Sequence, residues 1–157
     1  MDYWAKRGKY GQGAHSDIDW QATGQAMSKA TIPRRHWVSK HSSGFCGTSK
    51  MMHRWGKRAT NLCPRFLHAV DCATHVWQCQ DLCALQVWKQ SLANLEVWLK
   101  QQRTEPGIIK VLCAKLLAWQ SGSTEDILVG AFLGLQEVVQ KQDKIGLPSL
   151  LEGRPAL

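Results

Sequence analysis

A dense group of cysteines and histidines lies in the middle of this chain, between Cys63 and Cys79. A structural zinc site takes four Cys or His ligands in a tetrahedron, and chains usually supply them as two close pairs. Cys63-Pro-Arg-Phe66 has the spacing of one pair with phenylalanine at its second position, and His75 with Cys79 forms the other. The pattern predicts three zinc ligands, Cys63, His75 and Cys79, and one position still to be filled.

Two residues are candidates for the fourth ligand. On a helix, Cys72, His75 and Cys79 would fall at i, i+3 and i+7 and face the same side. His68, two residues after Phe66, is the alternative. A metal-free interpretation is also open, because free cysteine is among the most buried residue types and these thiols could pack in a core.

Positive charge is concentrated before and at the start of this cluster. The net charge is +8; residues 1–70 hold 12 Lys/Arg against 3 Asp/Glu, which gives +9, and residues 71–157 hold 8 against 9, which gives −1. Clustered Lys and Arg favour an anionic partner because they release counterions condensed on phosphates. The alternative is a basic surface that contacts only solvent. We expect RNA or DNA as the partner, contacted by Arg34, Arg35, Lys40, Lys50, Arg54, Lys57 and Arg58.

Hydrophobic periodicity predicts a mainly α fold. Apolar residues recur at spacings of three and four from Leu82 to Leu99, the pattern of a long amphipathic helix. Asp17 or Asp19 can cap a first helix that runs to about Lys29. The further predicted helices cover residues 33–41, 50–58, 82–103, 108–121 and 127–142.

These elements predict one small helical domain over residues 17–142. It would carry an irregular zinc-knuckle-like insertion with the cluster at 63–79, basic helices before it and two or three amphipathic helices after it. Residues 1–16 are expected to form a flexible basic arm, and residues 143–157, rich in Gly and Pro, an irregular tail.

The cysteines also indicate the compartment. No secretory signal precedes them, and thiols in a reducing environment are more often metal ligands or buried groups than disulfides. We therefore expect an intracellular protein of the nucleus or cytoplasm. No apolar run reaches the length that a membrane span requires, so no membrane association is expected.

No residue pattern favours catalysis, and we expect no enzyme. A thiol hydrolase could pair Cys46 or Cys72 with His53 or His75, but no local motif supports such a pair. The alternative to nucleic-acid binding is a helical protein-interaction or oligomerisation domain without metal. It would use the apolar faces of residues 82–99 and 127–139, and a second copy of the chain is one possible partner.

The order of the motifs along the chain adds a resemblance. The relevant segments are Arg34-Arg35-His36-Trp37-Val38, Gly44, Lys50-Met-Met-x-Arg54-Trp55, Cys63-Pro-Arg and His75-Val-Trp-x-Cys79. Together they resemble a cysteine-rich module of retroelement origin, found near the C-terminal, zinc-binding part of reverse transcriptases. The likeness covers roughly residues 17–154, and only its cysteine block is chemically specific.

The resemblance implies zinc as cofactor, with Cys63, His75 and Cys79 at ligand positions. Phe66 stands where the module has its second cysteine, and Leu147 stands where an aromatic residue is usual. Because the chain also stops soon afterwards, the resemblance implies a degenerate and truncated copy. The aromatic-x-Asp-Asp signature of a polymerase is missing, so the expected function is a noncatalytic, phosphate-dominated and weakly sequence-selective nucleic-acid-binding module.

Overall fold

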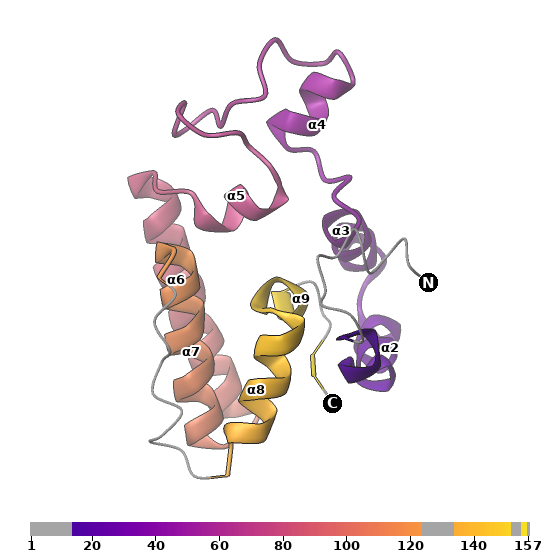
Figure 1. Cartoon of the computed structure of the whole chain (residues 1–157), viewed down its shortest axis with the longest axis vertical. Helices are drawn as coiled ribbons and strands as arrows, with labels where there is room; N and C mark the ends of the chain where they lie inside the picture. Colours follow the sequence, from indigo (N-terminus) through magenta and orange to yellow (C-terminus); the bar gives the residue numbers. More distant parts are fainter. Residues whose placement is uncertain (1–13, 124–133, 152–154, 157) are drawn as a thin grey trace. The chain divides into compact units, whose positions relative to one another are not determined.

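The computed structural model describes residues 14–123, 134–151 and 155–156 (Figure 1). Its contacts divide the chain into two compact units. The terminal unit comprises Met1–Cys46 and Gln136–Leu157, and the central unit comprises Gly47–Leu135. This division does not coincide with the predicted boundaries at residues 16 and 142. The predicted arm at residues 1–16 lies almost wholly outside the described residues.

The described part of the terminal unit begins with a short 3₁₀ helix, η1 (Ala14–Asp17), which two α-helices follow. Helix α2 (Trp20–Lys29) is capped by Asp19, one of the two predicted caps, whose carboxylate accepts a hydrogen bond from the backbone N–H of Ala22 at 2.8 Å. Helix α3 (Ile32–Ser42) has proline in its first turn, where no backbone donor is lost.

Two C-terminal helices complete the terminal unit. Helix α8 (Gln136–Ile145) contacts η1, and α9 (Leu147–Leu151) follows it. Ile18 and Ile145 are almost fully buried together, and Lys144 forms an ion pair with Asp17 at 2.6 Å. The backbone of Ile18 also pairs with that of Ala156 in an isolated antiparallel bridge. Residues 147–151, for which an irregular tail is predicted, are therefore helical. Most of the first part of the predicted helix 127–142 lies outside the described residues.

A helical pair forms the core of the central unit. Helix α6 (Leu82–Gln101) lies beside α7 (Pro106–Ser121), close to the bounds that the apolar periodicity predicts (Figure 1). The short helix α5 (Ala73–Gln78) packs against α7. Gln78 donates from its side-chain amide to the carbonyl of Trp119 at 2.8 Å, which ties α5 to the end of α7. The buried hydrophobic side chains of the pair are Leu92, Ile109, Val111 and Leu116.

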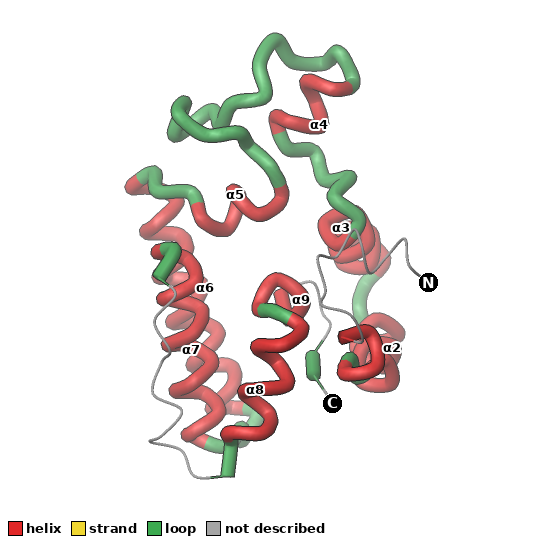
Figure 2. Tube along the Cα trace, viewed as in Figure 1, coloured by secondary structure: helices red, strands yellow, loops and turns green. Residues whose placement is uncertain are grey.

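Helix α4 (Ser49–Arg54) is shorter than the predicted helix over 50–58. Gly56 has a φ of 66° directly after its C-cap, a left-handed conformation that glycine adopts without strain and that ends helices. The backbone N–H of Lys57 then donates to the carbonyl of Met52 at 2.8 Å, which closes the last turn. Lys57 and Arg58 consequently follow the helix, and loop fills most of the chain from there to α5 (Figure 2).

The expected fold class, mainly α, is confirmed for the part of the chain that the structure describes. Isolated bridges are its only β pairing in those residues. Among the same residues, no helix is both long enough and apolar enough to cross a membrane.

Candidate metal centre

Cys63 is positioned by a narrow loop in which the chain folds back on itself. The backbone N–H of Cys63 donates to the carbonyl of Ala69 at 2.8 Å, and that of Asp71 donates to Asn61 at 2.9 Å. At the turn, the N–H of Phe66 donates to the sulfur of Cys63 at 3.4 Å. We call residues 61–71 the cysteine loop. This loop holds the Cys63 side chain in place, and the Cys63 sulfur accepts a backbone hydrogen bond within the loop.

His75 and Cys79 come from α5 and from its end. His75 lies within the helix, and Cys79 is the C-cap residue with an extended backbone at φ −60° and ψ 127°. The backbone N–H of Asp81 donates to the sulfur of Cys79. Because the chain leaves the helix at Cys79, its thiol can turn toward the cysteine loop instead of continuing along the helix.

The three side chains meet in one group, in which the two cysteines are buried and the histidine is half-buried. One ligand atom from each of Cys63, His75 and Cys79 lies within 4.8 Å of the others, and the two sulfurs are 3.8 Å apart. The cysteines are only 4% and 5% exposed. The Nε2 atom of His75 is buried and has no hydrogen-bond partner among the described residues. A buried polar atom without a partner costs free energy, so this nitrogen is explained best by a ligand that it would bind. The group could hold a metal ion.

The protonation of Cys79 follows from its surroundings. Burial raises the pKa of this thiol above its usual value, the hydrogen bond and charge of Cys63 raise it further, and the Asp81 carboxylate adds to the effect. The backbone N–H of Asp81 opposes them by lowering the same pKa. Without a cation the thiol is therefore held protonated, and a metal ion at this point would supply the positive charge that favours the thiolate.

The two candidate fourth ligands do not join the group. Cys72 is the N-cap residue of α5, with an extended backbone at φ −112° and ψ 173°, so the expected helical spacing from Cys72 to Cys79 does not exist. His68 is exposed in the cysteine loop, where its ring meets that of Phe66 edge to face at 5.8 Å. Neither lies with the three ligand atoms that converge in the described part of the chain.

The predicted phosphate-binding residues divide between the two units. Arg34, Arg35 and Lys40 belong to α3 in the terminal unit. Arg34 stands over the ring of Trp37 at 6.0 Å, a cation–π contact. Arg35 donates to the carbonyls of Ala30 and Ser28 at 2.8 and 3.1 Å, so it caps the end of α2. Of these three, Arg35 is the one already engaged in hydrogen bonds.

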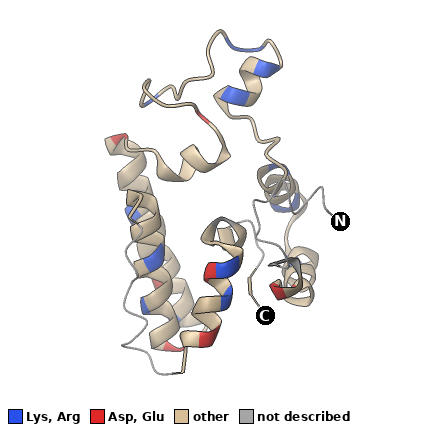
Figure 3. Cartoon of the chain, viewed as in Figure 1, with Lys and Arg blue, Asp and Glu red and all other residues tan. Residues whose placement is uncertain are grey.

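The other four predicted contacts accompany the metal group in the central unit. Lys50 and Arg54 lie on α4, and Lys57 and Arg58 follow it, in the part of the chain where Figure 3 marks Lys and Arg in blue. All four are exposed. Arg65, within the cysteine loop, is a further exposed cation that the sequence reasoning left out of the site. Its position two residues after Cys63 is the sequence feature from which Arg65 could have been added to the predicted contacts.

Sequence reasoning also missed the acid that joins the cysteine loop to α4. The carboxylate of Asp71 accepts both the backbone N–H and the hydroxyl of Ser49, each at 2.7 Å. Arg58 donates to the same hydroxyl at 2.6 Å, and Ser49 is only 1% exposed. We call Asp71, Ser49 and Arg58 the anchor. Asp71 is the single acidic residue between positions 47 and 80, and this isolation was the available signal.

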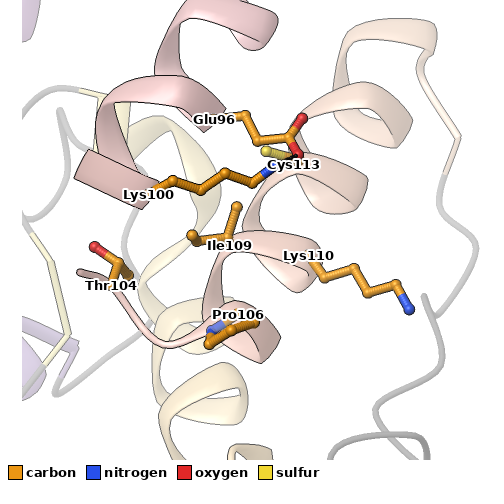
Figure 4. Close-up of a pocket in the computed structure, with 7 residues that line it drawn as sticks. All are labelled: Glu96, Lys100, Thr104, Pro106, Ile109, Lys110 and Cys113. Atoms are coloured by element: carbon orange, nitrogen blue, oxygen red, sulfur yellow. Dashed lines mark hydrogen bonds and ion pairs between the residues drawn. The ribbon is translucent and has the colours of Figure 1, made fainter. Parts of the chain in front are cut away.

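A cavity of about 500 Å³ lies apart from this group, on α6, α7 and the turn between them (Figure 4). Glu96 and Lys100 pair at 2.7 Å on its wall. Burial, and secondarily the charge of Glu96, raise the pKa of Cys113 beside them, so this thiol stays protonated and is a poor nucleophile. The cavity therefore offers less distinctive chemistry than the cysteine and histidine group.

Comparison of the chain with protein-family models, with curated proteins and with solved structures finds no match.

Proposed function

We propose that residues 47–79 form a zinc-ordered, noncatalytic module that binds RNA or DNA mainly through phosphates. One observation carries the proposal. The candidate metal group lies in the same unit as a cationic stretch, residues 50–65, which contains five exposed Lys or Arg and no Asp or Glu. Such a stretch attracts a polyanion whatever its sequence.

The donor set and its spacing favour zinc. Two thiolate sulfurs about 2.3 Å from one zinc ion at the tetrahedral angle would be about 3.8 Å apart. The sulfurs of Cys63 and Cys79 are separated by 3.8 Å. Two thiolates with one imidazole are soft and borderline donors, which suit zinc better than magnesium or calcium. Backbone N–H groups on both sulfurs would further stabilise them as thiolates.

Metal binding would stabilise the cationic stretch through the anchor. Zinc at Cys63 would stabilise the cysteine loop, and the last residue of that loop, Asp71, holds the first residue of α4, Ser49. The backbone N–H of Lys50 donates to the carbonyl of Asp71 at 3.1 Å as well. The ion would thus order the helix that displays Lys50 and Arg54 without touching nucleic acid itself.

Exposed tryptophans support a single-stranded ligand. Trp55 directly follows Arg54 and is 45% exposed. An exposed aromatic ring beside cations stacks on bases of any identity, and one stacked base contributes about 1–3 kcal/mol. Trp55→Ala should therefore weaken binding of single strands more than binding of a duplex.

Metal content tests the zinc centre. Protein purified without chelator should contain one zinc per chain, and Cys79→Ala should lose it. Cys83→Ala is the matched control, because Cys83 is exposed and lies outside the group. Equal zinc content in both variants, or none in the unaltered protein, would refute the centre.

Salt dependence tests nucleic-acid binding. Affinity for a single-stranded RNA or DNA oligonucleotide should fall steeply with salt. In a plot of log affinity against log salt concentration, each phosphate contact should contribute about −0.7 to the slope. The triple variant K50Q/R54Q/K57Q should flatten the slope. A control with the same charge, K29Q/K89Q/R103Q, replaces exposed cations outside the module and should bind nearly as the unaltered protein does. A flat slope in the unaltered protein, or equal losses in the two variants, would contradict the proposal.

The retroelement origin belongs to the same proposal. It rests on the order of basic helix, tryptophan-bearing helix and cysteine block, and it implies nucleic acid as the ancestral ligand.

A second candidate function, a helical interaction or oligomerisation domain, draws on exposed apolar side chains of α6. Leu82, Val87 and Trp98 are 82%, 64% and 54% exposed. Much of the predicted stripe is used within the chain, because Leu92 is buried and Leu95 half-buried. If a second copy of the chain covers this face, light scattering should detect a dimer, and V87E/W98E should dissociate it. A monomer at all concentrations would refute this second function.

A further inference from the structure

We propose that Cys63, His75 and Cys79 are the only ligands that the described residues supply to the zinc ion and that the fourth position takes a neutral ligand from solution. This inference rests on the zinc centre of the proposed function. It assigns a ligand-binding position to the site, with water as the occupant in the isolated protein and imidazole-like nitrogen donors as competitors. The evidence is the residue that stands at the expected fourth position and the charge around the group.

Phe66 occupies that position in the chain. It lies three residues after Cys63, and its backbone N–H donates to the Cys63 sulfur. Its ring centroid is 6.4 Å from that of His75, at an interplanar angle of 31°. The phenylalanine is therefore beside the ligand group but brings no atom that can bind a metal.

No other described side chain replaces it. Cys72 and His68 lie outside the group of converging ligand atoms. The ring of Phe66 lies close to the rings of both His68 and His75, with centroid distances of 5.8 and 6.4 Å. A zinc ion with three protein ligands keeps its fourth position for water or another small molecule.

The charge of the site selects a neutral occupant. Two thiolates neutralise Zn²⁺, so the centre with a neutral imidazole has no net charge. An anionic fourth ligand would give this largely buried centre a net negative charge, whereas water or imidazole would leave it neutral.

Cobalt reports the coordination directly. Co²⁺ substitutes for zinc in such sites, and its visible absorption changes when a ligand is exchanged. The cobalt-loaded full chain should respond to added imidazole at lower concentration than to azide. Phe66→Cys should abolish the response by completing four protein ligands. It should also raise zinc affinity about tenfold or more, since even groups outside the first ligands change affinity about 10–100-fold.

Three further variants keep the test decisive. Phe66→Ala removes the ring without adding a ligand and should retain the imidazole response, which covers the case in which Phe66→Cys fails to fold. His68→Ala and Cys72→Ala should leave the cobalt spectrum unchanged. A spectrum altered by either variant, no response to imidazole, or a stronger response to azide would overturn the inference while leaving the zinc centre intact. Failure of the unaltered chain to bind cobalt or zinc would instead overturn the proposed function.

Discussion

Replacing Asp71 with alanine should destabilise the central unit by about 3 kcal/mol and weaken nucleic-acid binding without removing a positive charge. The carboxylate accepts two hydrogen bonds from Ser49, both at 2.7 Å. Ser49 is 1% exposed, so water cannot readily replace the lost acceptor. The substitution therefore leaves a buried N–H without a partner and weakens the hold on the first turn of α4.

The magnitude follows from these contacts. A hydrogen bond to a charged group contributes about 1.5–3 kcal/mol, and a buried donor left without a partner costs about 1–3 kcal/mol. The hydroxyl of Ser49 can still meet Arg58, which donates to it at 2.6 Å, so only part of the second bond is lost. About 3 kcal/mol is the resulting expectation for Asp71→Ala. Asp71→Asn keeps an oxygen acceptor and should cost about 1 kcal/mol.

Urea unfolding, followed by circular dichroism at fixed zinc concentration, measures this loss. Glu105→Ala is the matched control, because Glu105 caps α7 in the same unit through one exposed hydrogen bond to Ile108 at 2.9 Å. The control should lose about 1 kcal/mol. Hydrogen exchange should speed up over residues 49–54 only in the Asp71 variant. If the two alanine variants lose equal stability, the anchor does not hold α4 and the reasoning fails.

Three other predictions concern the core, pH and thiol reactivity. Leu116→Ala, at a side chain 2% exposed, should cost about 3 kcal/mol in urea unfolding, whereas Leu117→Ala, at a position 48% exposed, should cost less than about 1 kcal/mol. Burial lowers the pKa of His41, so the unfolded chain binds the proton more readily. Stability should therefore fall as pH drops below about 6.5, and His41→Gln should flatten this dependence; identical pH profiles would contradict the prediction. Iodoacetamide should modify exposed Cys83 well before Cys113, whose pKa burial raises; mass spectrometry of the time course would show the reverse order if the prediction is wrong.

Local patterns predicted most of the helices. The apolar spacing from Leu82 to Leu99 predicts α6, and the Glu105-Pro106 signal lies at the start of α7. Asp19 caps α2 as its residue type suggests. These predictions agree with the structure because helix periodicity and capping depend on neighbours within a few residues. The helix predicted over residues 50–58 was too long because Gly56, with its left-handed backbone, ends α4. The sequence alone does not tell whether a given glycine adopts a positive φ.

The sequence by itself also brought Cys63, His75 and Cys79 together as candidate ligands, since their residue types and paired spacing limit the chemistry they can share. Only the tertiary structure decided that Cys72 and His68 stay outside the group. The reason is that α5 has extended backbone at both caps, Cys72 and Cys79, which breaks the helical spacing that would have aligned Cys72 with the others. Convergence of ligands depends on how the cysteine loop folds back against α5, and that packing is set by contacts between segments distant in sequence.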